Sequence, residues 1–310
     1  MKHNFYSSED VENVPEFIEE ALKYKYAPVQ LVGTGKTLVM IFFNSSLRTR
    51  LSTEIAARKI GMEVITININ DAWQWELEDG SAMVFDTVEH VKDAAKVIGT
   101  YADIVAIRAF PGFTDKTADY ADKLINTYMR HSPVPVINME SAIRHPLQSL
   151  ADLMTIREHV KVENPKIVLS WAPHVKALPQ AVSNSFLEWC GAAGHEVIVT
   201  HPKGYELAKE FIDGHRVEYD REAAFADADV VYVKNWSSYK QYGSILSKNT
   251  DWTITDQTMK LTNNAAFMHC LPIRRNLVAM DNVIDSNSSL IYEQAENRLH
   301  SAAFVLKNLI

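Results

Sequence analysis

The chain has 310 residues, 47% hydrophobic and 23% charged, which is too long for one ordinary compact core, so we expect two domains. Its formal net charge of −8 at pH 7 excludes a protein that grips a nucleic-acid backbone through a broad basic face, and no apolar run reaches the roughly 20 residues of a membrane span. Its two cysteines, Cys190 and Cys270, show no metal-ligand spacing, so we expect no disulfide framework and no zinc site, and a soluble cytoplasmic protein fits best.

The first half of the chain alternates short apolar runs with amphipathic helical patterns. A helix is expected to begin at Ser45–Arg50, directly after the first apolar run. Strands are predicted at residues 37–43, 63–70, 103–110 and 133–140, with further helices at 89–102 and 117–131. This alternation is typical of a parallel sheet covered by helices.

The alternation then repeats, after a helix predicted from about 146 to 160. Strands are predicted at residues 166–173, 195–202, 229–236 and 264–272, with helices at 180–194, 205–214 and around 254–261. A last amphipathic helix covers residues 293–310. We therefore predict an α/β protein with two doubly wound parallel-sheet domains, at residues 1–150 and 151–290, followed by a C-terminal helix at 291–310.

Polar side chains of one chemical kind follow several predicted strands. In open α/β sheets the ligand lies beyond the carboxyl ends of the strands, so these positions are the candidate site. They supply cations, a carboxylate, an imidazole, an amide and a thiol: Arg48, Arg50, Arg108, Glu140, His145, Gln148, Lys234, Cys270 and Arg274. Chance placement would scatter such groups along the chain.

The segment Ser45–Arg50 has the composition of a polyanion site. Unpaired N–H groups at a helix start and the positive end of the helix dipole favour phosphate, and two arginines add donors in a planar fork. The alternative is an ordinary Ser N-cap followed by surface arginines.

His145 and Gln148 are three residues apart at a helix start, so their side chains face the same way. An imidazole and an amide there could polarise one carbonyl oxygen and stabilise the negative charge that develops on it. A capping or surface histidine is the alternative. No catalytic Cys-His pair is indicated around Cys270. We expect its thiol to lie near a reacting amine, with the Leu271 carbonyl as hydrogen-bond acceptor, or else to be a small core residue.

Glu140, Lys234 and Arg274 form a mixed-charge set in which the cations could hold a carboxylate and the glutamate an amine or amide N–H. Solvated surface charges are the alternative, although Lys234 stands in an otherwise apolar strand. Trp73 lies in a polar loop, where an aromatic side chain is either a packing plug or a ligand wall.

Three strings, in this order, resemble the aspartate/ornithine carbamoyltransferase family across essentially the whole chain. Ser46–Arg50 resembles its carbamoyl-phosphate loop, residues 145–148 (His-Pro-Leu-Gln) its carbonyl clamp, and residues 269–272 (His-Cys-Leu-Pro) its ornithine-branch signature. The resemblance implies a homotrimer with shared active sites, to which Trp73 would reach from a neighbouring subunit. It also implies that the C-terminal helix returns to the first domain, and it implies neither a metal nor an organic cofactor.

The resemblance also implies roles for individual residues. Arg108, His145, Gln148 and Cys270 would be catalytic. The carbamoyl-phosphate site would comprise Ser46, Leu47, Arg48, Thr49, Arg50, Trp73, Arg108, His145, Gln148, Cys270, Leu271 and Arg298.

One departure from the family pattern indicates an N-acylated substrate. Enzymes of free ornithine carry a Ser-Met-Gly loop with an aspartate that grips the α-ammonium group, whereas this chain has Lys234 there. A lysine would repel that ammonium but not a neutral amide. The second-domain string of the aspartate branch is absent. By resemblance to the acylornithine carbamoyltransferases, Glu140, Lys234 and Arg274 would bind the acylornithine.

The acyl group is predicted from the segment Asp86–His90. By resemblance, acetyl enzymes carry a glutamate just before Glu-His and succinyl enzymes a proline; here the residue is Val88. A glutamate would repel a succinyl carboxylate, and Val88 does not, so succinyl is favoured. His174 and Lys176 could receive the distal carboxylate, the alternative being a pair of solvent-facing residues.

These observations predict transfer of a carbamoyl group from carbamoyl phosphate to the δ-amine of N2-succinylornithine, in arginine biosynthesis. The alternatives are the same reaction on N2-acetylornithine, then on free ornithine, and, from another class, a catalytically silent phosphate-binding paralogue with a regulatory role.

Overall fold

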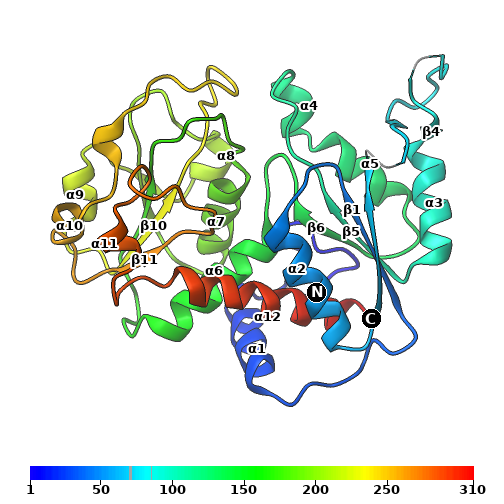
Figure 1. Ribbon diagram of the computed structural model, residues 1–310, viewed down its shortest axis with the longest axis horizontal. Helices are drawn as coiled ribbons and strands as arrows, with labels where there is room; N and C mark the ends of the chain where they lie inside the picture. The colour runs from blue at the N-terminus through cyan, green and yellow to red at the C-terminus, as the bar shows by residue number, and fades with distance from the viewer. Residues whose placement is uncertain (70–71, 85) are drawn as a thin grey trace. The chain divides into compact units, whose positions relative to one another are not determined.

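The computed structural model describes residues 1–69, 72–84 and 86–310, which form two compact units (Figure 1). Unit 1 comprises Met1–Glu12, Lys23–Leu147 and Arg298–Ile310, and unit 2 comprises Asn13–Leu22 and Gln148–Asn297. The chain therefore passes between the units within three helices: α1 (Val14–Tyr26), α6 (Pro146–His159) and α12 (Ile291–Leu309).

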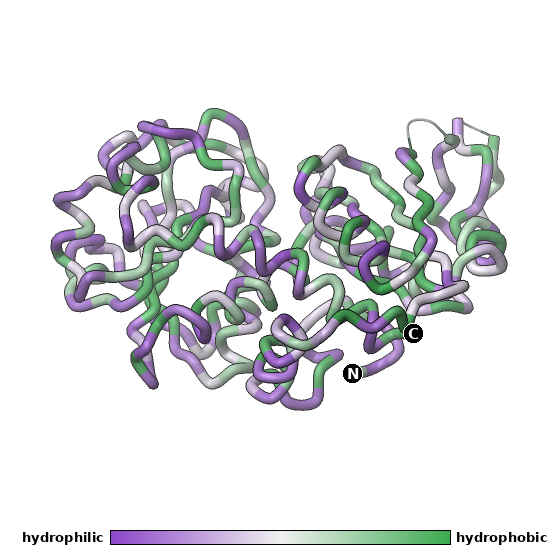
Figure 2. Tube along the Cα trace, turned by 60° about the horizontal axis from the view of Figure 1, so that its bottom comes forward, coloured by the Kyte–Doolittle hydropathy of each residue, from purple (hydrophilic) through white to green (hydrophobic). Residues whose placement is uncertain are grey.

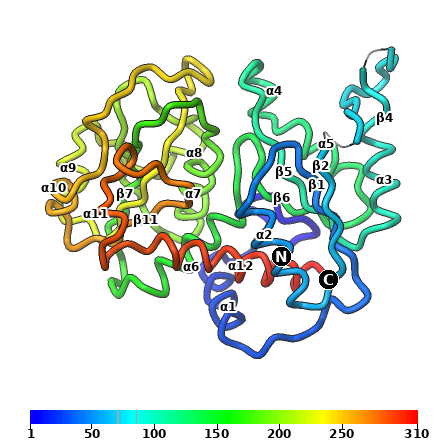
Figure 3. The backbone as a smooth tube through the Cα atoms, viewed as in Figure 1, coloured from blue at the N-terminus to red at the C-terminus, as the bar shows by residue number. Residues whose placement is uncertain are grey.

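Unit 1 is built on a parallel four-stranded sheet in the order β2-β1-β5-β6, whose strands lie side by side in Figure 3. The strands are β1 (Thr37–Phe42), β2 (Glu63–Asn68), β5 (Ile104–Arg108) and β6 (Val136–Glu140). The helices are α2 (Leu47–Lys59), α3 (Val91–Tyr101), α4 (Lys116–Tyr120) and α5 (Lys123–His131), with a 3-10 turn at Ser8–Asp10. Two short strands, β3 (Trp75–Glu76) and β4 (Glu89–His90), pair with each other.

Unit 2 is built on a parallel five-stranded sheet in the order β11-β10-β7-β8-β9. The strands are β7 (Ile167–Trp171), β8 (Val197–Thr200), β9 (Arg216–Val217), β10 (Val230–Lys234) and β11 (Ala266–Met268). The helices are α7 (Ala181–Ala192), α8 (Lys209–Ile212), α9 (Arg221–Phe225), α10 (Asp256–Met259) and α11 (Asp281–Ile284), with a 3-10 turn at Thr250–Trp252.

The inner strands are buried on both faces because helices cover each sheet. Every residue of β5 and β7 is buried, as is every residue of the edge strand β6, beside which Phe5 forms a bridge to Ile137, and Figure 2 shows hydrophobic and hydrophilic segments alternating along the trace. The edge strand β2 instead alternates between exposed and half-buried residues. Uniformly apolar strands of this kind are typical of parallel sheets in α/β proteins, so the predicted fold class is confirmed.

The observed elements differ from the predicted ones at several places, and α1, β3, α9 and α11 were not predicted. The predicted helix at 117–131 is broken into α4 and α5 at Asp122, whose φ of 46° is left-handed. The two-residue edge strand β9 was too short to predict, and the helix expected at 205–214 contracts to α8. The last strand ends at Met268, so residues 269–272 follow it as a loop. Asn70, predicted at the end of a strand, lies outside the described residues.

Among the described helices, none combines the length and the apolar composition required to cross a membrane.

Candidate active site

The loop after β1 is fixed at both ends. Ser46 is the N-cap of α2, where its Oγ accepts a hydrogen bond of 3.3 Å from the Thr49 backbone N–H. Asn44 Oδ1 accepts a hydrogen bond of 2.6 Å from the backbone N–H of Phe110, just after β5. Both contacts lie at the carboxyl end of the sheet, so the positive end of the α2 dipole is directed at the region where a ligand of an open α/β sheet binds.

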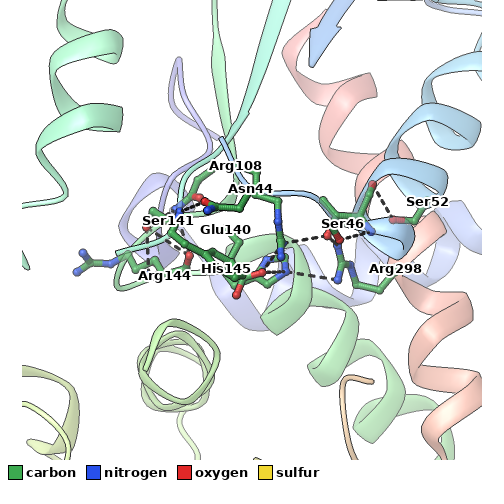
Figure 4. Close-up of polar contacts among 12 residues, drawn as sticks. Asn44, Ser46, Ser52, Arg108, Glu140, Ser141, Arg144, His145 and Arg298 are labelled. Carbon is green, nitrogen blue, oxygen red and sulfur yellow. Dashed lines mark hydrogen bonds and ion pairs between the residues drawn. The ribbon is translucent and has the colours of Figure 1, made fainter. Parts of the chain in front are cut away.

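Five buried side chains from five segments of unit 1 meet around Thr49. Arg108 Nη1, at the end of β5, and Arg298 Nη2, on α12, each donate to Thr49 Oγ1 at 3.3 Å. Arg108 also forms an ion pair with Glu140 at the end of β6. His145, just before α6, has its Nε2 3.4 Å from Arg298 Nη1 and 3.5 Å from Glu140 Oε2 (Figure 4). We call these five residues the Thr49 cluster.

The charges of the Thr49 cluster suit an anion. With a neutral imidazole, its two guanidinium groups and one carboxylate carry one net positive charge, and Arg108 and Arg298 are each only 7% exposed. Buried charge is costly unless it is compensated, so the cluster favours a negatively charged ligand. Arg298 Nη1 can only donate, so its 3.4 Å contact with His145 Nε2 is a hydrogen bond in the tautomer in which that nitrogen carries no proton.

A second buried network, missed by the sequence analysis, holds the segment between Glu140 and His145. Asp122 Oδ1 accepts from the Ala142 backbone N–H at 2.9 Å, and Asp122 Oδ2 accepts from the Tyr6 hydroxyl at 2.7 Å and from Ser141 Oγ. Burial raises the pKa of Asp122 to about 6, although these donors lower it in part. No sequence pattern joins Tyr6 to Asp122, so only the fold could reveal this support.

In unit 2, the predicted residue Gln148 lies in the first turn of α6, and the predicted residues Cys270 and Leu271 lie in the loop after β11. Gln148 is 1% exposed, and its Nε2 donates to Asp152 Oδ1 at 2.6 Å. Its carbonyl oxygen therefore faces away from Asp152. Cys270 is half-buried, and the Leu271 backbone N–H donates to His269 Nδ1 at 2.9 Å. Leu271 has a left-handed φ of 52°, so this hydrogen bond supports a strained turn.

The predicted acylornithine residues of unit 2 form a compact group of cations around His174. Arg274 Nε donates to His174 Nε2 at 3.4 Å, and His174 Nδ1 lies 2.9 Å from the Lys176 carbonyl oxygen. Burial lowers the pKa of His174, the hydrogen bond to that carbonyl raises it, and the charges of Lys234, Arg274 and Lys176 lower it further. Within the described part of the chain, Lys176, Lys234 and Arg274 form no ion pair, so this group can accept carboxylates.

Trp73 precedes β3 and Val88 precedes β4, and we call residues 73–90 the β3–β4 segment. Among the described residues, the hydrogen bonds of these two involve no member of the Thr49 cluster. Trp73 is 51% exposed and Val88 67% exposed. The Trp73 Nε1–H donates to Glu89 Oε2 at 2.7 Å, and the Val88 backbone N–H donates to the Gln74 carbonyl oxygen at 3.1 Å. The two side chains therefore share one exposed segment of unit 1.

The structure thus groups Thr49, Arg108, Glu140, His145 and Arg298 in one cluster and His174, Lys176, Lys234 and Arg274 in another. Other residues of the predicted phosphate loop differ in exposure: Ser46 and Arg48 are half-buried, Leu47 is 72% exposed, and Arg50 Nε lies 3.9 Å from Glu54 Oε2 on the same helix. Across residues 1–69, 72–84 and 86–310, no set of three or more His, Cys, Asp or Glu side chains is placed to hold a metal ion.

Family comparisons match both units. Residues 3–158 match the carbamoyl-P binding domain, and residues 179–309 the Asp/Orn binding domain, of aspartate/ornithine carbamoyltransferase. The chain belongs to the aspartate/ornithine carbamoyltransferase family. This membership confirms the resemblance inferred from the three strings.

Two relatives represent the acylornithine branch of the carbamoyltransferases. An N-succinylornithine carbamoyltransferase of Bacteroides thetaiotaomicron is 50% identical over 294 residues, covering 94% of this chain and 92% of that protein. An N-acetylornithine carbamoyltransferase of Xylella fastidiosa is 37% identical over 305 residues, covering 91% of this chain and 90% of that protein.

Solved carbamoyltransferase structures show the same fold. Acetylornithine transcarbamylase complexed with acetylcitrulline has a TM-score of 0.95 at 34% identity, covering 99% of both chains. A second structure is an N-acetyl-L-ornithine transcarbamylase in which one glutamate is replaced by valine, complexed with carbamyl phosphate and N-succinyl-L-norvaline. It has a TM-score of 0.94 at 34% identity, with 99% of both chains covered.

Proposed function

We propose that this chain transfers the carbamoyl group of carbamoyl phosphate to the δ-amine of N2-succinyl-L-ornithine, giving N2-succinyl-L-citrulline and phosphate. The amine nitrogen forms a bond to the carbamoyl carbon, the bond from that carbon to the phosphate oxygen breaks, and the proton that the amine loses passes to the leaving phosphate. The product class places the reaction in arginine biosynthesis, and we propose a cytoplasmic enzyme.

The Thr49 cluster supports the donor half of this proposal. Buried guanidinium groups beside a helix start can neutralise the leaving phosphate, and a neutral His145 can donate to the carbamoyl oxygen as negative charge develops on it. These groups position the donor and stabilise charge, which is the main work required when a neutral amine attacks directly.

The cations around His174 support the second half of the proposal, the binding of an acylornithine. A free α-ammonium group would be repelled by Lys176, Lys234 and Arg274, none of which is neutralised by another described residue. An N-succinyl amino acid has a neutral amide and two carboxylates, and carboxylates pair well with such cations. An N-acetyl amino acid would supply only one carboxylate, so the charge of this group favours succinylornithine.

Relative rates with three amines test the proposal. The purified protein is assayed for citrulline-type product with succinylornithine, acetylornithine and ornithine at equal carbamoyl phosphate. We expect kcat/KM to be highest for succinylornithine and lowest for ornithine. A preference for acetylornithine, the substrate in the name of the Xylella fastidiosa relative, would mean that the acyl group is acetyl and not succinyl. A preference for ornithine would contradict the argument from the cations, and no turnover with any amine would indicate a silent paralogue.

Val88→Glu is expected to lower kcat/KM for succinylornithine by about 10-fold or more, because a glutamate would place a negative charge near the succinyl carboxylate. A relative in which one glutamate is replaced by valine forms a complex with N-succinyl-L-norvaline, so such a replacement is compatible with a succinyl ligand in this family. Val88→Gln is the matched control, since glutamine has nearly the same size as glutamate but carries no charge. An unchanged ratio of succinyl to acetyl rates in Val88→Glu would show that this segment does not select the acyl group.

We further propose a homotrimer whose active sites are shared, with Trp73 serving a neighbouring subunit. The exposure of Trp73 and its place on the β3–β4 segment, outside the contacts of the Thr49 cluster, support this assignment. Light scattering of the purified protein reports the trimer, and mixed trimers of Trp73→Ala and His145→Ala subunits should recover activity if sites are shared.

A further inference from the structure

Gln148 of the predicted carbonyl clamp and the loop after β11 are joined by hydrogen bonds within unit 2. Both lead to one buried carboxylate, Asp152, on the second turn of α6, which is 0% exposed. Gln148 Nε2 and Gln294 Nε2, the latter on α12, each donate to Asp152 Oδ1 at 2.6 Å. Neither Asp152 nor Gln294 lies in one of the three strings that carry the family resemblance.

The polarity of these bonds is determined by chemistry. An ionised carboxylate has only acceptor atoms, so each glutamine must turn its NH2 end toward Asp152 and its carbonyl oxygen away. Two donations to one buried oxygen compensate part of the cost of burying this polar group. Without such an acceptor, either end of each amide could face inward.

The second branch reaches the loop after β11. Gln294 Oε1, turned outward by Asp152, accepts from the His269 backbone N–H at 3.0 Å, and His269 Nδ1 accepts from the Leu271 backbone N–H. Tyr232, buried on β10, extends the network: burial, Asp152 and Cys270 all raise its pKa well above the ordinary value. The same carboxylate thus faces groups from α6, α12 and β10.

We propose that Asp152 is a positioning residue for carbamoyl transfer: it fixes which end of the Gln148 amide faces the substrate and, through Gln294 and His269, fixes the backbone of Leu271. This inference rests on the proposed function of Gln148 and Leu271. Asp152 itself touches neither substrate in this assignment.

Four variants test the role of Asp152. Asp152→Leu removes the hydrogen-bond acceptor while keeping a side chain of roughly similar volume. Asp152→Asn keeps one acceptor oxygen. Gln294→Leu cuts only the second branch, so it serves if Asp152→Leu does not fold. Thr155→Val is the matched control, because it removes the 2.9 Å bond from Asn297 Nδ2 to Thr155 Oγ1, which joins the same two helices one turn further on.

We expect Asp152→Leu to lower kcat by about 10- to 100-fold with little change in KM for the acylornithine, since the end of Gln148 that meets the carbamoyl group is mispositioned while the groups that bind the acylornithine are kept. Asp152→Asn should retain most of the activity, Gln294→Leu should be intermediate, and Thr155→Val should keep kcat within about twofold even if it is less stable. Equal losses in Asp152→Asn and Asp152→Leu, or in Thr155→Val and Asp152→Leu, would overturn the proposal. So would an unchanged kcat in Asp152→Leu or Gln294→Leu.

Hydrogen exchange separates this proposal from the proposed function. The amides of His269 and Leu271 should exchange at least about 10-fold faster in Asp152→Leu and Gln294→Leu than in wild type, but not in Thr155→Val. This readout needs no substrate. If the wild type transfers carbamoyl groups to no amine, the proposed function fails, while unchanged exchange in the first two variants would overturn the role of Asp152.

Discussion

Arg108→Ala is expected to lower kcat/KM for carbamoyl transfer by about 1000-fold. Arg108 is the residue through which the Thr49 cluster is joined, because its guanidinium contacts both Thr49 on α2 and Glu140 on β6. Its loss removes a cation beside the donor phosphate and also leaves the buried Glu140 without that partner, which costs about 3–5 kcal/mol when a buried ion pair is broken. Steady-state kinetics with varied carbamoyl phosphate measure the effect.

The surface arginine Arg275 provides the matched control for this prediction. It pairs with Asp281 at 2.9 Å and with Asp285 at 2.7 Å, and those groups are exposed. Arg275→Ala should leave kcat/KM within about twofold, since exposed ion pairs contribute little. Arg108→Lys keeps the charge but not the planar fork, so only partial recovery is expected. Activity of Arg108→Ala within tenfold of wild type would show that the Thr49 cluster does not bind the donor.

His145→Ala is expected to lower kcat by about 100- to 1000-fold with a much smaller change in KM for carbamoyl phosphate. The reason is that a donor to the carbamoyl oxygen is required more strongly in the transition state than in the bound ground state, as for other oxyanion contacts. Single-turnover measurements at saturating donor separate this chemical step from binding.

His159, at the other end of α6, provides a control for a non-specific effect on the fold of removing a histidine. His159 is the last residue of α6, and its Nε2 lies 3.4 Å from Glu158 Oε2. His159→Ala should leave kcat within about twofold. If His145→Ala raises KM for the donor while kcat stays unchanged, His145 holds the donor equally in both states and does not stabilise the developing charge.

Most of the parallel strands were predictable because they are short, largely apolar runs followed by turn residues. β1 and β5 were found nearly to the residue, since a strand buried on both faces must be apolar throughout. β9 has only two residues and lies at a sheet edge, where partial exposure removes the apolar signal. The break at Asp122 was also hidden, because a left-handed residue is stabilised there by partners distant in the chain.

The candidate site was predictable as a set of chemical groups but not as an arrangement. Arg108, His145 and Arg298 could be named from their motifs, yet only the fold places all three around Thr49. Sequence spacing suggested that His145 and Gln148 polarise one carbonyl together. In the structure the NH2 end of Gln148 donates to Asp152, a contact that the spacing of the motif does not reveal.

The sequence by itself determined the family, the two α/β halves and the charged groups available to two anionic substrates, because these follow from local patterns of apolar runs and short motifs. Which of those groups meet, and which polar residues support them, became visible only in the folded chain. Tyr6, Asp122, Asp152 and Gln294 leave no local signal, since a buried polar residue is recognised by partners that lie more than 100 residues away in several of these pairs. Their hydrogen bonds form only when the chain has folded and the alternative partner, water, has been excluded.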